Sequence, residues 1–206
     1  MLLDDGPVTF GEFVANTRPA LSEISRAVFE YLKARPDAVL FGAHAVNAYV
    51  EPARMTADVD IMSTAAAEVA EELRRLLAER FHIAARVRVV ANGCGFRVYQ
   101  VRKPKNRHLV DVRQVDALPK TNTIKKIRVI IPSELIILKL ASYMARGHTE
   151  KGLSDRLDLH RLLRVFPQLR SEHSGPVAER LVSAPMKRAW GRLLLERIEQ
   201  TDDDDY

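Results

Sequence analysis

The sequence lacks cysteine pairs, long apolar runs and clusters of histidine. Cys94 is the only cysteine among 206 residues, so an internal disulfide and a multi-cysteine metal site are both excluded. No apolar stretch approaches the roughly 20 residues that a membrane-spanning helix needs. No histidine or cysteine pattern is typical of a zinc site. Disulfide-stabilised, membrane-spanning and zinc-dependent classes are therefore not expected.

The first residues, MLLDDGPVTF, also lack the basic segment and the long apolar core of a secretory signal. We therefore expect a cytoplasmic protein. The apolar content of 47% and the charged content of 29% are those of an ordinary globular protein. The length suits one domain, or one domain with a helical appendage.

Positive charge is present in excess and is unevenly distributed. The formal net charge is +5 although the tail TDDDDY is acidic, and Arg and Lys concentrate between Arg86 and Arg128. A basic central surface is expected of a protein that binds nucleotide or nucleic acid phosphates. Solvated strand faces in a mildly basic protein explain the same pattern equally well.

Hydrophobic periodicity predicts an alternation of helices and short strands in the first third of the chain. Apolar residues at helical spacing predict a first helix over about 17–34, and a short apolar run before Gly42 predicts a buried strand. The further elements expected are a helix at 43–50, a strand at 58–62 and an amphipathic helix at 64–81 with Thr64 as its N-cap.

A series of strands and then a series of helices follow. Strands are expected at 85–91 and 95–102, joined by an Asn-Gly hairpin turn, and at 108–115 and 124–131. Three helices are expected after Pro132, at 133–145 with Ser133 as N-cap, at 155–166 and at about 176–199. The order predicts an α/β (α+β) fold. A small mixed sheet flanked by helices, with the N-terminal helix, occupies 1–131. A C-terminal helical region (132–200) and the acidic tail (201–206) follow.

Two aspartates, Asp58 and Asp60, are spaced i and i+2 in the expected strand 58–62 and so share one face of it. Two close carboxylates repel and raise each other's pKa unless a cation lies between them. Mg²⁺ suits such a pair, because it binds one or two carboxylates together with waters and substrate phosphates. The alternative is an edge strand whose polar face lies in water.

The neighbouring residues favour the metal hypothesis. Gly42 lies at a strand–helix junction where backbone N–H groups can hold a phosphate, although most such junctions are tight turns. Asp111 is a third isolated strand carboxylate, or else an exposed strand position. Arg54 and Thr56 are candidates to hold the carboxylates or the phosphates, or are surface polar groups. Three carboxylates beside a phosphate cradle suit two-metal nucleotidyl transfer, with Asp111 holding the second ion or acting as base.

The stretch GAHAVNAYVEPARMTADVDI resembles the signature of the nucleotidyltransferase (polymerase-beta-like) fold, and more narrowly that of AbiEii-type nucleotidyltransferases. These are often toxins of type IV toxin–antitoxin systems. A second block, KLASYMAR followed by SDRLDL, resembles a later element of the same family. The two blocks span about Phe41–Leu163.

The resemblance implies roles for particular residues. Gly42 and its neighbour Ala43, which replaces the usual Gly or Ser, would bind the triphosphate. A group of aspartates would bind Mg²⁺ or Mn²⁺, namely Asp58, Asp60 and Asp111. A second group would contact phosphate or help place the nucleotide or acceptor, namely Lys139, Asp155 and Asp158. Lys139 interrupts an otherwise apolar helix, so it either reaches solvent or has an anionic partner.

The expected function is a metal-dependent nucleotidyltransferase that moves a nucleoside monophosphate from an NTP to an acceptor. RNA such as tRNA, a protein hydroxyl and a small molecule are the candidate acceptors, and an antitoxin is a candidate partner. The alternative is a catalytically weak or inactive module that binds nucleotide or a partner protein. A third class is a nucleic-acid-binding domain with a fortuitous Asp-x-Asp.

Overall fold

The computed structural model describes residues 18–196. The chain divides into two compact units, Met1–Ile131 and Pro132–Tyr206, and each is described by itself. The start of the first expected helix at residue 17, the end of the last one at 197–199 and the acidic tail lie outside the described residues.

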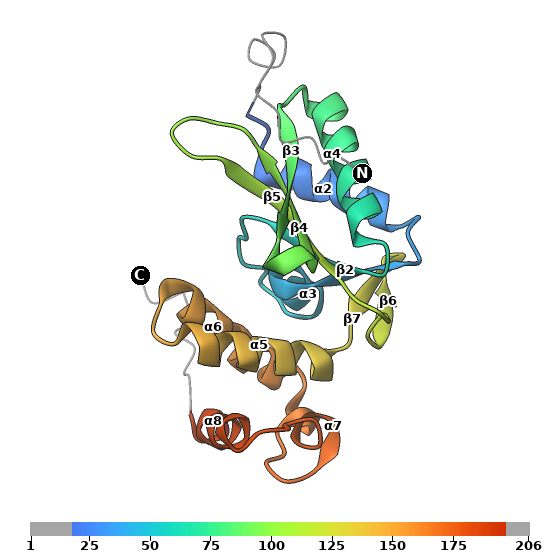
Figure 1. Cartoon of the computed structure of the whole chain (residues 1–206). Coiled ribbons are helices and arrows are strands. Elements are labelled where there is room, and N and C mark those ends of the chain that lie inside the picture. The colour runs from blue at the N-terminus through green and yellow to red at the C-terminus, as the bar shows by residue number, and fades with distance from the viewer. Residues whose placement is uncertain (1–17, 197–206) are drawn as a thin grey trace. The chain divides into compact units, whose positions relative to one another are not determined.

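A seven-stranded sheet forms the centre of the first unit, in the order β3-β4-β5-β2-β1-β7-β6 (Figure 1). Strand β1 runs parallel to β7 and β2 runs parallel to β5, while the other neighbours are antiparallel, so the sheet is mixed. The strands are β1 (Ala38–Phe41), β2 (Val59–Ser63), β3 (Ala85–Val90), β4 (Gly95–Gln100), β5 (Arg107–Gln114), β6 (Thr121–Ile124) and β7 (Ile127–Ile130).

Within residues 18–131, the helices that pack on this sheet are α2 (Leu21–Leu32), α3 (Gly42–Tyr49) and α4 (Ala66–Phe81). Helix α4 contacts β2, β3, β4 and β5. Its apolar stripe, including Leu73 and Leu77, is fully buried, as expected of a helix with apolar residues three and four positions apart. Val98 and Val110 of the sheet are also fully buried. Because side chains alternate between the two faces along a strand, the residues next to these valines lie on the opposite face of the sheet.

The second unit is helical and contains α5 (Pro132–Arg146), α6 (Glu150–Val165), α7 (Gly175–Ala178) and α8 (Ala184–Leu195). Helix α5 packs against α6, α7 and α8. The core of this unit includes the fully buried Leu140, Leu159 and Trp190. The short 3₁₀ helices are η1 (Ala91–Gly93) in the first unit and η2 (Pro167–Leu169) in the second. No helix within residues 18–196 is both long and apolar enough to cross a bilayer.

The mixed sheet flanked by helices confirms the expected fold class, and the Asn92-Gly93 hairpin joins β3 and β4 as predicted. The single strand expected at 124–131 is wrong. The chain reverses at Lys125 and Lys126, whose φ angles are 49° and 69°, and pairs β6 with β7. Two positive φ angles are typical of the tight hairpin turn that follows strand twist. Lysine residues in the sequence do not predict such a turn.

Neither predicted N-cap is in place. Ala65 precedes α4 without a capping side chain. Its N–H donates to Ser63 Oγ at 3.0 Å, and the N–H of Ala66 donates to Gln114 Oε1 at 3.0 Å. The partner of the first helical N–H thus comes from β5, 48 residues away. Helix α5 begins at Pro132, one residue earlier than expected, because proline suits the first helical position.

The helix expected at 176–199 is also corrected, because it is broken into α7 and α8. Ser183 caps α8 by accepting from the N–H of Met186 at 3.3 Å. Its side chain therefore supplies a new helix start where periodicity indicated continuation.

Candidate functional site

A row of charged side chains crosses the middle of the sheet. Asp60 on β2 is the register partner of Asp111 on β5, and Asp111 is the register partner of Arg97 on β4. Register partners on adjacent strands present their side chains to the same face. The sheet therefore brings together two of the three aspartates predicted from the sequence and adds an arginine.

Gly42 lies against Asp60 at the first residue of α3. Its φ is +69°, and a Cβ built there would lie 1.9 Å from Asp60 Oδ2. Only glycine combines the left-handed backbone with space for the carboxylate. Phe41 before it provides no capping side chain, and N–H groups at the start of a helix are able to bind an anion. Ala43, next in α3, is buried.

Asp58 lies in the bend before β2 and is partly exposed. Its carbonyl oxygen accepts a hydrogen bond from Thr56 Oγ1 at 3.2 Å. The strand expected to begin at Asp58 thus begins one residue later. Thr56 contacts the backbone that carries Asp58, a contact with which it could position the carboxylate.

Asp111 is held by a two-pronged contact with Arg97. Arg97 Nε donates to Asp111 Oδ1 at 2.6 Å, and Arg97 Nη2 donates to Asp111 Oδ2 at 2.8 Å. These hydrogen bonds raise the pKa of the Arg97 guanidinium above its ordinary value, and the charges of Asp58 and Asp60 add to the increase. Arg97 was not predicted from the sequence, because partnership across strands depends on register.

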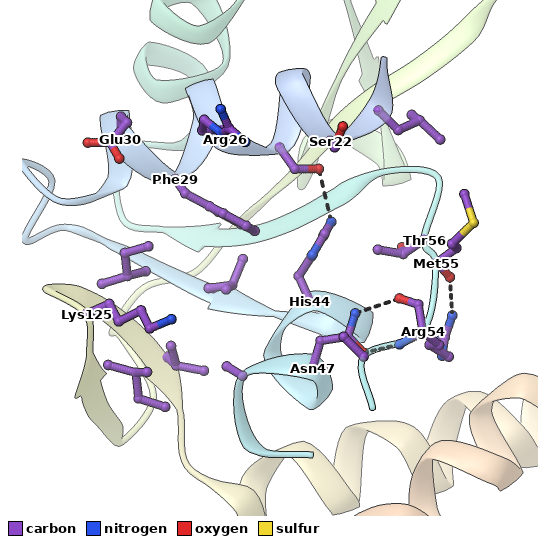
Figure 2. Close-up of a pocket in the computed structure, with 18 of the residues that line it drawn as sticks. Ser22, Arg26, Phe29, Glu30, His44, Asn47, Arg54, Met55, Thr56 and Lys125 are labelled. Carbon is purple, nitrogen blue, oxygen red and sulfur yellow. Dashed lines mark hydrogen bonds between the residues drawn. The ribbon is translucent and has the colours of Figure 1, made fainter. Parts of the chain in front are cut away.

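The loop that carries Arg54 is hydrogen-bonded to α3. Asn47 Nδ2 donates to the carbonyl oxygen of Arg54 at 2.7 Å, and the N–H of Arg54 donates to Asn47 Oδ1 at 3.1 Å. Arg54 Nη1 also donates to the carbonyl oxygen of Met55 at 3.2 Å. Figure 2 shows these contacts at the wall of a pocket.

That pocket has a volume of about 730 Å³ and lies between α2, α3, the 51–56 loop and the β6–β7 turn (Figure 2). Arg54 and Thr56 line it, whereas the three aspartates do not. His44 lines it as well, with Nε2 3.3 Å from Ser25 Oγ and its ring edge-to-face with Phe29 at 5.0 Å. Burial, helped by the charge of Arg54, lowers the pKa of His44 to about 4, so its ring is neutral at neutral pH.

The remaining predicted site residues lie in the helical unit and bind one another. Lys139 Nζ lies 2.8 Å from Asp155 Oδ1 and 2.7 Å from Asp158 Oδ2, and Arg146 Nη1 lies 2.9 Å from Asp155 Oδ2. Lys139, Asp155 and Asp158 are buried. The anionic partners expected for Lys139 are thus these two aspartates. Its predicted contact with phosphate stays a prediction.

The donor set of the sheet suits a hard divalent cation, because carboxylate oxygens are the ligands that Mg²⁺ and Mn²⁺ prefer. Asp60 and Asp111 are adjacent, and Gly42 leaves room beside Asp60. Among residues 18–196, no three His, Cys, Asp or Glu side chains already form a coordinating group. In the same structure the oxygens of Asp111 face Arg97.

No protein-family model matches the sequence, and no curated protein matches it. The structure is similar to that of the Megavirus polyadenylate synthase, with a TM-score of 0.56 and 14% identity over 73% of this chain. The chain spans only 33% of that protein. This similarity concerns the fold, which is that of the nucleotidyltransferases.

Two further solved structures cover more of both chains at lower TM-scores. An antigenic nucleotidyltransferase-like protein from Paracoccidioides brasiliensis has a TM-score of 0.49 and 15% identity, covering 89% of this chain and 86% of that one. JHP933 from Helicobacter pylori has a TM-score of 0.41 and 13% identity, covering 91% and 92%.

Proposed function

We propose that the protein is a nucleotidyltransferase. An acceptor hydroxyl oxygen attacks the α-phosphorus of an NTP. A new P–O bond forms, the bond between the α-phosphorus and the bridging oxygen breaks, and pyrophosphate leaves with that electron pair. The observation that carries this proposal is the position of Asp60, which lies against the start of α3 at Gly42 and beside Asp111 on the next strand.

Each residue of this arrangement has a task in the proposed reaction. The N–H groups at Gly42 and Ala43 bind the triphosphate at the positive end of α3. Asp58 and Asp60 would hold Mg²⁺ or Mn²⁺, and Asp111 would hold a second ion or accept the hydroxyl proton. When bound, the divalent cation would neutralise phosphate charge and activate the hydroxyl. Thr56 positions Asp58 through its backbone, and Arg54 lies in the same loop.

The acceptor we favour is RNA, such as a tRNA 3′ end. Arg88 and Arg113 are exposed. Arg88 is the register partner of Arg97, and Arg113 follows Asp111 at i+2, so both arginines lie on the face of the aspartates. Cations on that face would hold a phosphate backbone beside the proposed reaction centre. The motif resemblance of the sequence supports an AbiEii-like toxin with an antitoxin partner.

The test uses each of the four NTPs labelled at the α-phosphate, with Mg²⁺ or Mn²⁺, total RNA and cell extract. Label should enter one acceptor class from the α-labelled NTP and never from the γ-labelled one, because pyrophosphate is released. Asp60→Asn should abolish labelling, and Asp116→Asn, an exposed aspartate beyond β5, should leave it intact. Transfer by the D60N variant would refute the mechanism.

The toxin role has a separate test. Induced expression in a bacterial host should arrest growth, and D60N should relieve the arrest at equal protein level. Growth arrest by D60N would show that toxicity is independent of nucleotidyl transfer.

The Arg97–Asp111 contact also favours the second candidate, a module that binds nucleotide without transferring it. That function predicts NTP binding in a filter or calorimetric assay with no label transferred under any of the conditions above. Transfer from any NTP excludes it.

A further inference from the structure

The arginine in the row of carboxylates contacts the same oxygens that a metal ion would bind. Arg97 contacts both oxygens of Asp111, at 2.6 and 2.8 Å. A guanidinium fork matches a carboxylate in this geometry and uses both oxygens at once. A divalent cation binds a carboxylate through the same oxygens. The contact seen here and metal coordination by Asp111 therefore compete.

Arg97 also supplies positive charge beside the aspartates of the sheet. Asp60 and Asp111 are adjacent in register, and the charges of Asp58 and Asp60 act on Arg97 as well. Close carboxylates repel unless a cation is near. Arg97 supplies one from β4, within the same sheet.

We propose that Arg97 is an internal counter-ion that holds both oxygens of Asp111 until a divalent cation replaces it, and that it thereby sets the metal affinity of the site. This inference rests on the proposed function, because it assumes that Asp60 and Asp111 bind metal. The exchange is purely ionic: the guanidinium leaves the carboxylate and the cation takes its place, with no change of oxidation state.

The test measures Mn²⁺ binding by calorimetry and by electron paramagnetic resonance, without nucleotide. Arg97→Met keeps an unbranched apolar stem and removes the charge and the donors. Mn²⁺ should bind the R97M variant about tenfold more tightly than the wild type, since a charged hydrogen-bonded contact no longer has to be broken. Arg97→Lys keeps the charge but loses the fork, and should lie between the two.

Two control variants separate competition from a general change of charge. Arg88→Met removes the neighbouring arginine of the same face, which contacts the ring of Tyr99, and should change Mn²⁺ affinity by less than about twofold because exposed charges are well screened. In an Asp111→Asn background, Arg97→Met should no longer tighten binding, because the contested carboxylate has been replaced by a neutral amide.

A second readout is thermal stability with EDTA, where R97M should unfold a few degrees below the wild type because the carboxylates have lost their counter-ion. Saturating Mn²⁺ should remove most of that difference. Circular dichroism checks that each variant is folded, and R97K serves if R97M is not.

Equal or weaker Mn²⁺ binding by R97M overturns the inference, as does an equal gain in R88M or the absence of Mn²⁺ binding in both the wild type and R97M. Failure of the proposed function has a different result. If R97M binds Mn²⁺ more tightly but the wild type transfers no nucleotide, the role of Arg97 as counter-ion is supported and the nucleotidyltransferase function is refuted. If the wild type transfers nucleotide and R97M shows no gain in Mn²⁺ affinity, the nucleotidyltransferase function is supported and the role of Arg97 as counter-ion is refuted.

Discussion

The two units each contain a cluster of aspartates with a basic partner, and the clusters differ in burial. In the sheet, the side chains of Arg97 and Asp111 are 33% and 27% exposed. In the helices, those of Lys139, Asp155 and Asp158 are 8%, 5% and 0% exposed. The same residue types thus form an accessible cluster in one unit and a closed one in the other.

The comparison shows that burial and the geometry of the basic partner decide what an acidic cluster can do. Lys139 and Arg146 together face two carboxylates across α5 and α6, so a buried site has its charges matched within the protein. A buried carboxylate without a partner is costly. The partly exposed row of the sheet is accessible from solvent, as the proposed replacement of Arg97 by a divalent cation requires. Four experiments would sharpen or break this contrast.

The largest effect is expected for Asp60→Ala in the sheet. Nucleotidyl transfer should fall by about a thousandfold or more, equivalent to about 4 kcal/mol of transition-state stabilisation. The unfolding midpoint should fall by no more than a few degrees, because Asp60 is partly exposed and contacts of partly exposed charges contribute little to stability. Labelled-NTP assays and thermal denaturation measure the two quantities. A large loss of stability instead would make Asp60 as structural as the aspartates of the helices.

Lys139→Met should destabilise the helical unit by about 3–5 kcal/mol, because two buried carboxylates lose their shared cation. Urea denaturation monitored at Trp190, which is buried in the same unit, measures the change. Adding Asp155→Asn and Asp158→Asn should restore part of the stability. Unchanged stability together with a raised KM for NTP would contradict the structural role and support the predicted contact of Lys139 with phosphate.

Gly42→Ala should cost about 1–3 kcal/mol of stability from the positive φ. It should also reduce transfer by about tenfold to a hundredfold, because a 1 Å misplacement at a reacting centre has effects of this size. A Cβ there would lie 1.9 Å from Asp60 Oδ2. Gly93→Ala is the matched control, since Gly93 also has a positive φ but no atom within 4 Å of its Cβ position. Equal losses of activity in both variants would argue against the close approach at Asp60.

The smallest effect is expected for Arg146→Met, which should cost less than about 1 kcal/mol. The Arg146 side chain is 47% exposed, and Asp155 keeps Lys139 as a partner. Urea denaturation of this variant and of Lys139→Met compares the stability lost with an exposed cation and with a buried cation on the same carboxylate. A loss as large as that of K139M would show that exposure does not distinguish the two.

Much of the fold was predictable because it depends on local patterns. Apolar spacing indicated α2, α4, α5 and α6, and Asn92-Gly93 indicated the β3–β4 hairpin. The patterns were less informative where a distant group or an unusual residue took part. Gln114 reaches the start of α4 from β5, and Lys125 and Lys126 turn the chain where glycine or asparagine is usual.

The candidate site was predictable only in its residue types. The spacing of Asp58 and Asp60 and the glycine at a strand–helix junction are visible in the sequence. That Asp111 is the neighbour of Asp60, and that Arg97 is the neighbour of Asp111, depends on strand order and register. A shift of register by one residue would send those side chains to the other face.

The sequence by itself determined which groups carry charge and which segments bury their apolar faces, because composition and periodicity are properties of the chain. Only the tertiary structure decided which charges meet. It placed Asp60 against Gly42, Arg97 on Asp111 and Lys139 between Asp155 and Asp158. Ion pairing requires a separation of a few ångströms between residues up to 19 positions apart in these clusters, and the packing of strands and helices sets that separation.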